Sequence, residues 1–288
     1  MSDWRSISCR PSARRPKDHR WPGPPAAFLQ RCDYLQRLAG TAFSFTLFGI
    51  GSVVLAVVVL APLNLVVTDQ ARRSRLARAC VHWCFAAFVR TMIVLRVIDF
   101  EITDAAALEA DRGRLVIANH PSLIDVVLII SRMRTTQCIV KHQHWRNPFL
   151  RSIFAATGYI RNDEDPQRLI DDCVRALAAG DNLIVFPEGT RTVPGRSRVL
   201  QRGFANIAVA AGAEVRLLTI RCIPTTLTRG ENWYQIPPSR PRFTLSVHEI
   251  IDVAAMAAEC PPAIAARRLT RHVAQRFAEI LDDARPRV

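Results

Sequence analysis

The stretch RLVIANHPSLIDVVLII at residues 114–130 places His120 and Asp125 between two apolar runs. The first run, RLVIA, is short and rich in aliphatic residues, which predicts a buried strand. The second run follows a proline suited to the first turn of a helix. A carboxylate between two hydrophobic segments is costly unless a partner pairs with it. Asp125 is therefore expected either to lie at a polar edge or to serve His120.

Strand-like and helix-like segments alternate after residue 100. Strands are expected at 114–118, 137–140, 182–186, 215–221 and 242–248, and helices at 121–133, 147–156, 166–179, 201–211 and 261–283. This alternation predicts an α/β domain with a mostly parallel central sheet flanked by helices. Such folds bind ligands beyond the carboxyl ends of their strands, which is where His120 is expected.

His120 and Asp125 are close enough in sequence to share a hydrogen bond. A carboxylate that accepts from one imidazole nitrogen fixes the tautomer and leaves the other nitrogen as a general base. Such a pair can deprotonate a hydroxyl that attacks an activated ester, without a covalent serine intermediate. Ser122 is an alternative nucleophile, but in the first turn of a helix its hydroxyl is expected to satisfy backbone donors instead.

A second candidate site, FPEGTR at 186–191, follows the apolar run NLIV. Gly189 lets the backbone approach a ligand, and free N–H groups there can bind an oxyanion. Arg191 can bind phosphate through two nitrogens. Glu188 disfavours an anion, so it is expected to hold an arginine or the loop in place. The alternative is a solvated turn with incidental arginines. Further positive charge comes from Arg196, Arg198 and Arg202.

The composition combines 49% hydrophobic residues with a net charge of +14 over 288 residues. This favours an anionic membrane surface or a phosphorylated substrate over nucleic acid, for which no motif is present. Only Lys17 and Lys141 are lysines among 39 basic residues, so part of the charge reflects a coding bias towards arginine. The scattered cysteines predict neither a disulfide framework nor a metal site, and they favour a reducing compartment.

The N-terminal part divides into a basic tail over 1–30 and a membrane-associated segment over 31–100, before a catalytic domain over 101–288. The tail reads as disordered, or as a start codon assigned too early. Leu38 to Thr68 contain no charged residue. As a helix they would extend roughly 46 Å, against a hydrocarbon core of about 30 Å.

Arginines flank this apolar segment on both sides, which favours a re-entrant hairpin with both ends in the cytoplasm. A turn is expected near Gly49-Ile50-Gly51, and a single tilted span is the alternative. A helix over 72–96 follows and is expected either to lie at the membrane interface or to be an ordinary domain helix. Its inward face is expected to carry Leu76, Trp83, Ala87 and Val94.

Taken together, the two motifs resemble those of the glycerophospholipid acyltransferase family, which contains the 1-acylglycerol-3-phosphate acyltransferases. Its first block, NHxSxxD, is matched by Asn119, His120, Ser122 and Asp125, and its FPEGTR block is matched in full. A proline after an apolar strand resembles Ile223-Pro224. The resemblance covers residues from about 80 to 255.

The resemblance implies transfer of a fatty acyl group from coenzyme A or acyl carrier protein to a lysophospholipid, 1-acyl-sn-glycerol-3-phosphate above all. His120 would be the base and Asp125 its orienting partner. No cofactor beyond the thioester is implied, and the implied location is the cytoplasmic side of the inner membrane. The acceptor phosphate would contact Glu188, Gly189, Thr190 and Arg191, with supporting roles for Asn119, Ser122, Lys141, Pro187 and Pro224.

One block departs from the family pattern. The family places an arginine about six residues after a glycine, whereas Arg161 follows Gly158 by three and Glu164 stands at the expected spacing. Either Arg161 contacts the phosphate, or the acceptor is another lipid, such as a lyso-ornithine lipid, a different lysophospholipid or a polyketide-type lipid. A non-enzymatic protein that binds anionic lipid is a further alternative. Acceptor, donor, chain length and oligomeric state stay open.

Overall fold

The computed structural model describes residues 24–134, 136–146, 148–162, 165–192 and 199–282. Most of the tail predicted at 1–30 lies outside these ranges, as do Glu164, Arg196 and Arg198. Residues 24–30 belong to the first helix, so that part of the tail prediction is wrong.

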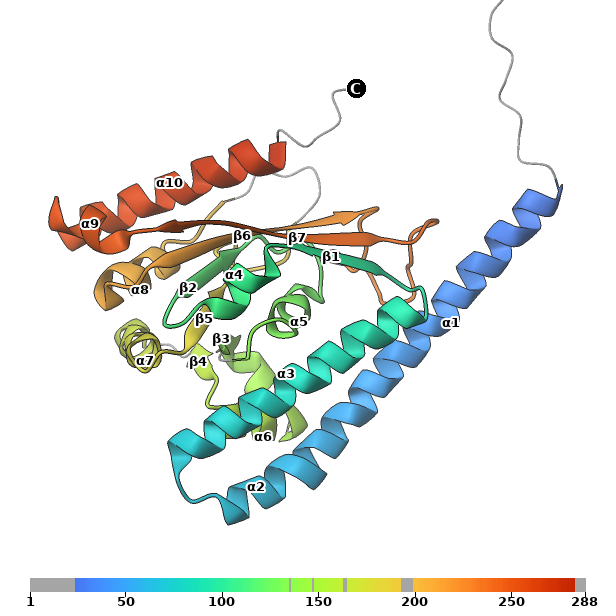
Figure 1. Ribbon diagram of the computed structural model, residues 1–288, viewed down its shortest axis with the longest axis horizontal. Coiled ribbons are helices and arrows are strands. Elements are labelled where there is room, and N and C mark those ends of the chain that lie inside the picture. The colour runs from blue at the N-terminus through green and yellow to red at the C-terminus, as the bar shows by residue number, and fades with distance from the viewer. Residues whose placement is uncertain (1–23, 135, 147, 163–164, 193–198, 283–288) are drawn as a thin grey trace, which may run out of the picture.

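The N-terminal part is a long helical hairpin (Figure 1). Helix α1 (Pro24–Val54) continues through a π-helical segment (Leu55–Leu60) into α2 (Ala61–Val66). The chain then reverses, and α3 (Gln70–Val94) returns beside α1. Asp69 begins α3 by accepting two backbone N–H bonds in its first turn.

The turn expected at Gly49-Ile50-Gly51 is not present, because these residues are helical. A glycine costs a helix about 1 kcal/mol relative to alanine, and two glycines are insufficient to interrupt a helix of this length. The reversal falls instead at residues 67–69, just before the capping aspartate.

Helix α3 turns the opposite face to the domain from the one predicted. Leu76, Trp83, Ala87 and Val94 are all exposed. Both faces of α3 carry an apolar stripe, so hydrophobic periodicity does not distinguish them. Polar contacts help to fix the observed orientation, since His82 Nδ1 lies 2.7 Å from the Ile130 carbonyl oxygen. The buried stripe consists of Ala77, Val81, Phe88, Val89 and Met92.

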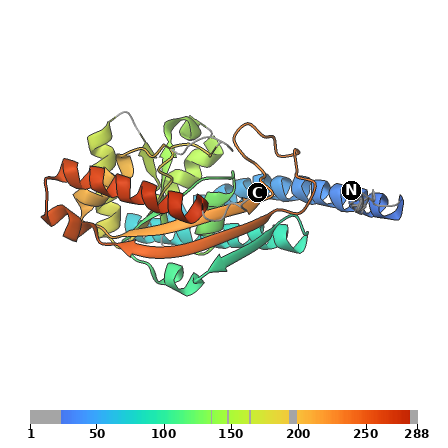
Figure 2. The same cartoon turned by 90° about the horizontal axis from the view of Figure 1, so that it is seen from above.

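The domain that follows is built on a central sheet, seen from above in Figure 2. The sheet has seven strands in the described part of the chain. The strand order is β1-β7-β6-β2-β5-β3-β4, and every neighbouring pair is parallel except β6 and β7. The predicted mostly parallel sheet flanked by helices is therefore confirmed. The strands are β1 (Asp99–Thr103), β2 (Leu115–Ala118), β3 (Thr136–Lys141), β4 (Ile160–Asn162), β5 (Asn182–Val185), β6 (Val215–Ile223) and β7 (Arg242–Ile251).

Helices cover both faces of the sheet and enclose two cores. Alternate residues of β2 belong to different cores: Val116 faces α3 and α5, whereas Leu115 faces α8 and α10. The C-terminal helix buries Leu269, Val273, Phe277 and Leu281, as its spacing predicts. The helices are α4 (Ala105–Ala110), α5 (Asp125–Ile130), α6 (Pro148–Thr157), α7 (Pro166–Ala178), α8 (Gly203–Ala211), α9 (Val253–Ala258) and α10 (Pro262–Asp282).

The helix predicted at 121–133 is shorter in the structure, where α5 begins at Asp125. The Asp125 carboxylate accepts the backbone N–H of Ser122, 2.7 Å away, and this bond accompanies a turn before the helix. The short strands β1 and β4 and the short helices α4 and α9 had no sequence pattern strong enough to predict them.

We expect Asp111→Ala to lower the free energy of unfolding by about 3–5 kcal/mol, because it leaves the buried Arg216 guanidinium without its carboxylate. Asp111 is fully buried and accepts from Arg216 Nε and Nη2, each at 2.8 Å. Chemical denaturation checks this prediction. The exposed pair Arg268–Glu259 provides the control, because Glu259→Ala should cost less than about 1 kcal/mol. Equal losses in the two variants would contradict the prediction.

Candidate active site

The two motifs meet at the carboxyl edge of the sheet. Strand β2 lies between β5 and β6, and Ile117 pairs with Val185 on one side and Leu217 on the other. All three strands run parallel, so the loops that follow β2 and β5 leave the sheet next to each other. This arrangement brings the His120 loop against the FPEGTR turn.

His120 and Asp125 form a hydrogen-bonded pair. His120 Nδ1 lies 2.8 Å from Asp125 Oδ2, and the Asp125 side chain is completely buried. An ionised carboxylate only accepts hydrogen bonds, so Nδ1 carries the proton in this pair. The histidine side chain is 19% exposed, which leaves its Nε2 lone pair available to a ligand.

Burial raises the pKa of the Asp125 carboxyl above its ordinary value of 3.8. The hydrogen bonds from His120 and from the Ser122 backbone oppose this effect by stabilising the charged form. Asp125 Oδ1 has no hydrogen-bond partner among the described residues. Ionisation of Asp125 in the folded protein therefore lowers the free energy of unfolding, although its two hydrogen bonds offset part of this loss.

The His120 ring is fixed from a second side by the FPEGTR turn. It stacks on Phe186 with ring centroids 4.1 Å apart and an interplanar angle of 21°. The His120 backbone N–H donates to Glu188 Oε1 at 3.3 Å, and its carbonyl accepts the Thr192 N–H at 2.7 Å. The Thr192 hydroxyl also donates to Glu188 Oε2 at 2.7 Å. Glu188 therefore holds the loop, one of the two roles expected for it.

Asn119 and Ser122 support the His120 loop in different ways. The Asn119 amide exchanges two hydrogen bonds with the backbone of Ile220, at 2.7 and 2.8 Å, and so ties the end of β2 to β6. The Ser122 hydroxyl is buried with no hydrogen-bond partner among the described residues. The expectation that this hydroxyl satisfies backbone donors is wrong, since the Ser122 backbone N–H makes the contact instead.

The FPEGTR turn is shaped by its glycine and braced by two cations. Gly189 has φ +67°, a conformation that favours glycine. Lys141 Nζ donates to the Gly189 carbonyl at 2.8 Å. Arg191 Nη1 donates to the carbonyls of Leu227 and Thr228, both at 3.0 Å. Lys141 Nζ and Arg191 Nη1 thus both donate to backbone carbonyls of the protein.

The remaining predicted residues lie at different depths around this turn. Thr190 is exposed, and Pro187 is buried with its carbonyl accepting the Gln201 N–H at 2.7 Å. Pro224 follows a cis peptide bond just after β6. Arg161 lies on β4, at the edge of the sheet and separated from β5 by β3. Its Nη2 is 2.6 Å from His142 Nδ1, and its guanidinium lies 5.7 Å from the Trp145 ring centroid.

Sequence reasoning missed Thr192, Leu227 and Thr228. Thr192 directly follows the matched motif, so an extension of the motif by one residue would have included it. Leu227 and Thr228 act through backbone carbonyls, which every residue type provides. No sequence signal identifies them.

The fold and the site together define a general class of protein, the α/β proteins that carry a carboxylate-paired histidine at the carboxyl edge of the sheet. Residues 99–226 match the family model described as Acyltransferase. The resemblance noted from the two motifs is thereby confirmed.

Named relatives agree with this assignment. The chain is 26% identical over 145 residues to a 1-acyl-sn-glycerol-3-phosphate acyltransferase of Chlamydomonas reinhardtii, covering 49% of this chain and 43% of the relative. It is 23% identical over 175 residues to the enzyme of that name in Borreliella burgdorferi, covering 58% and 67%. It therefore spans less than half the length of the first relative.

A solved structure shares the fold. The 1-acyl-sn-glycerophosphate (LPA) acyltransferase PlsC of Thermotoga maritima superposes with a TM-score of 0.66 at 22% sequence identity. The match covers 89% of this chain and 98% of that one, so the N-terminal hairpin and the domain belong to one shared architecture.

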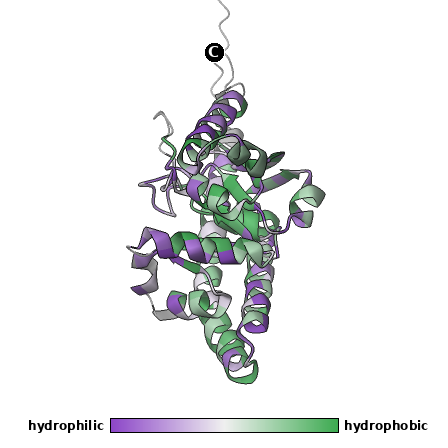
Figure 3. Cartoon of the chain, turned by 90° about the vertical axis from the view of Figure 1, so that its left-hand side faces the viewer, coloured by the Kyte–Doolittle hydropathy of each residue, from purple (hydrophilic) through white to green (hydrophobic). Residues whose placement is uncertain are grey.

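Within the part of the chain that the structure describes, two helical segments are long and apolar enough to cross a membrane, by length and composition: Phe28–Val66, of 39 residues, and Gln70–Val94, of 25. Figure 3 shows hydrophobic colouring at the lower end of the molecule, where α2 lies. Exposed apolar side chains there include Val57, Val58, Leu65 and Val66. With the bacterial relatives, these features indicate association with a membrane.

We expect Asp125→Asn to gain stability relative to the wild type as the pH rises from about 4 to about 7. Because the folded-state pKa of Asp125 is raised, its contribution to stability is fully present below its ordinary pKa of 3.8 and is lost as the pH rises through the raised value. Asparagine keeps the size and has no such loss. Denaturant titrations at each pH measure the difference.

The matched control is Asp171→Asn, an exposed position on α7. A difference between Asp125→Asn and wild type that stays flat or shrinks over this pH range would contradict the assignment of Asp125 as a charge held in place against its desolvation.

Proposed function

We propose that this protein transfers a fatty acyl group from a thioester to the free hydroxyl of a lysophospholipid. The donor is acyl-CoA or acyl carrier protein, and the first-choice acceptor is 1-acyl-sn-glycerol-3-phosphate, which would give phosphatidic acid. The observation that carries the proposal is the 2.8 Å bond between His120 and Asp125, beside the Glu188-braced turn, in a segment of the acyltransferase family. The names of the relatives support the acceptor.

In this mechanism His120 Nε2 removes the proton of the acceptor hydroxyl as its oxygen attacks the thioester carbonyl carbon. Asp125 keeps the proton on Nδ1 and stabilises the imidazolium that forms. The tetrahedral intermediate collapses, the carbon–sulfur bond breaks, and the imidazolium gives its proton to the departing thiolate. The new ester and the free thiol are the products, and His120 is regenerated without a cofactor or metal.

The FPEGTR turn is proposed to bind the acceptor's phosphate. Among the described residues, the backbone N–H groups of Thr190 and Arg191 have no hydrogen-bond acceptor, so a phosphate oxygen can take them. Arg191 has Nε and Nη2 left after its two carbonyl bonds. Lys141 adds a charge beside Gly189. Glu188 serves by holding this turn against His120, and Arg161 lies farther out as a second phosphate contact.

The hairpin is proposed to hold the protein on the cytoplasmic side of the inner membrane, with lipid tails as its partners. Arginines flank the apolar segment on both sides, which fits entry into and exit from one membrane face. Exposed arginines at the start of α3, Arg72 and Arg75, suit anionic headgroups. Both the acyl donor's chain and the acceptor would then approach the site from the bilayer.

We expect His120→Ala to lower acceptor-dependent thiol release from acyl-CoA by about 10²–10⁴-fold, because the general base is lost. The assay uses detergent-solubilised protein and a thiol reagent, and circular dichroism checks that the variant is folded. The matched control is His272→Ala, an exposed histidine on α10 that should keep full activity. Retained activity in His120→Ala would falsify the mechanism, and absence of thiol release from the wild type with every donor and acceptor would refute the acyltransferase itself.

The position of Arg161 favours a second candidate acceptor. Because this arginine is held at the outer strand beside His142 and Trp145, a lysolipid with a different headgroup is a specific alternative. A panel of lyso-acceptors, including lyso-ornithine lipid and lysophosphatidylcholine, separates the two candidates by kcat/KM. A clear preference for lysophosphatidic acid would exclude the alternative.

A further inference from the structure

The loop between β6 and β7, residues 224–241, touches the candidate site at its beginning. The Leu227 carbonyl accepts the backbone N–H of Leu123 at 3.1 Å and Arg191 Nη1 at 3.0 Å. Leu123 belongs to the His120 loop and Arg191 to the FPEGTR turn. A single carbonyl of the β6–β7 loop therefore ties the two motifs together.

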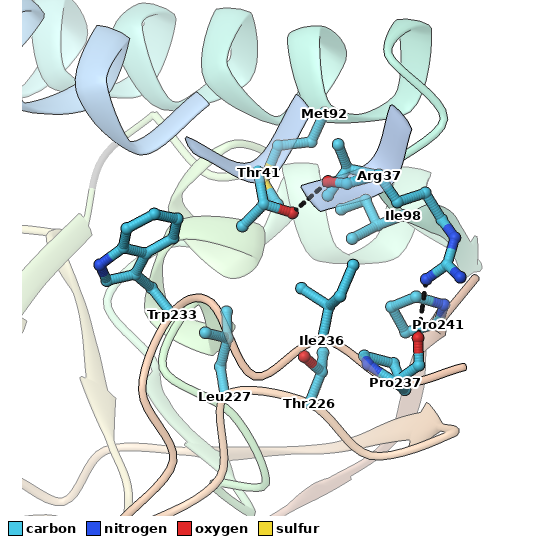
Figure 4. A pocket seen from close by; sticks show the side chains of 11 residues that line it. Arg37, Thr41, Met92, Ile98, Thr226, Leu227, Trp233, Ile236, Pro237 and Pro241 are labelled. Carbon is cyan, nitrogen blue, oxygen red and sulfur yellow. Dashed lines mark hydrogen bonds between the residues drawn. The ribbon is translucent and has the colours of Figure 1, made fainter. Parts of the chain in front are cut away.

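The same loop is held at its end by helix α1. Arg37, only 2% exposed, donates from Nη1 to the Pro237 carbonyl at 2.8 Å and from Nη2 to the Pro238 carbonyl at 2.7 Å. Its Nε donates to Asp33 at 2.8 Å. Figure 4 shows the guanidinium reaching from α1 to the loop. A buried guanidinium is stable only when its donors are satisfied, so these carbonyls are a specific binding site for Arg37.

Helix α1 fits closely against the domain at this level. A Cβ atom on Gly40 would lie 2.8 Å from Val97 Cγ2, closer than such atoms normally approach. Phe45, five residues after Gly40, packs against Trp233 of the loop with ring centroids 6.5 Å apart. The cavity left between helix and loop measures only about 20 Å³, near the size needed for one water. Helix α1 and the β6–β7 loop are thus packed directly against each other.

We infer that Arg37 is a positioning residue for acyl transfer, which acts through the β6–β7 loop on Arg191 and on the His120 loop. The inference rests on the proposed function. The pathway from Arg37 to the site has three steps. Arg37 binds the carbonyls of Pro237 and Pro238, the covalent segment 227–237 leads back along the loop, and the Leu227 carbonyl binds both motif loops. Arg37 therefore links the membrane hairpin to the geometry of the candidate site, rather than only fastening the hairpin to the domain.

Amide hydrogen exchange tests this link without any assay of activity. In Arg37→Ala, we expect exchange at the Leu123 amide and across residues 225–235 to accelerate about tenfold or more, because the loop loses its anchor. The matched control is Arg31→Ala, an exposed arginine on the same helix, which should change neither. Acceleration confined to α1 and to the amides of Ser239 and Arg240 would overturn the inference and leave Arg37 as a brace only.

Kinetics provide the second test. A small misplacement of the site should lower kcat of the folded Arg37→Ala protein by about tenfold, with KM for the acceptor changed less than about twofold. Arg37→Lys, which keeps the charge and can reach one carbonyl, should fall between Arg37→Ala and wild type. If the role is merely structural, the variants lose thermal stability and keep the kcat of the wild type.

A double-mutant cycle with Arg191→Ala makes the pathway explicit. Once Arg191 no longer binds the loop, Arg37→Ala should reduce kcat by clearly less than it does alone, whereas independent roles give multiplied losses. Should Arg37→Ala fail to fold, Gly40→Val displaces the same part of α1 and should show the same exchange pattern. A wild type without thiol release counts against the proposed function, while the exchange result still decides the inference.

Discussion

The hydrogen bond between His120 and the buried Asp125 carboxylate is the constraint on which the rest of the site depends. A charge without solvent has to be surrounded by donors, and here the donors are the His120 ring and the Ser122 backbone. Satisfying the carboxylate fixes the turn before α5, and this turn fixes the direction of the imidazole. The burial that makes Asp125 costly to the fold is also what keeps the His120 ring in one orientation.

Around this pair, the protein uses backbone groups more than side chains to bring separate segments together. Glu188 accepts the His120 N–H, Thr192 donates to the His120 carbonyl, and Leu227 accepts from both motif loops. Each bond joins segments that emerge from different strands at one edge of the sheet. The arrangement therefore needs the side chains of Glu188 and Arg191, but at His120 and Leu227 these bonds depend only on the position of the main chain.

The fold and the core of the site could be predicted because both depend on local patterns. Alternating segments determined the sheet type, and the five-residue spacing placed Asp125 within reach of His120. The parallel-strand rule brought the FPEGTR turn to the same edge. Helix α3 could not be oriented, since Leu76 and Ala77 lie on two stripes that are equally apolar. Leu227 and Arg37 were also beyond prediction, because their contacts use carbonyls that carry no residue identity and, for Arg37, span 200 residues.

The π-helical segment at Leu55–Leu60 interrupts the α-helical repeat between Arg37 and the reversal into α3. Its wider turn holds one more residue than an α-helical turn would, so loss of that residue would restore the ordinary repeat and leave the flanking helices facing the same way. Loss of a residue from the regular helix between Arg37 and this segment would instead rotate the upstream half of the hairpin by about 100°. Arg37 would then point away from the two carbonyls it occupies. The π-helical segment is therefore the place in this apolar stretch where the chain can shorten by one residue without displacing Arg37.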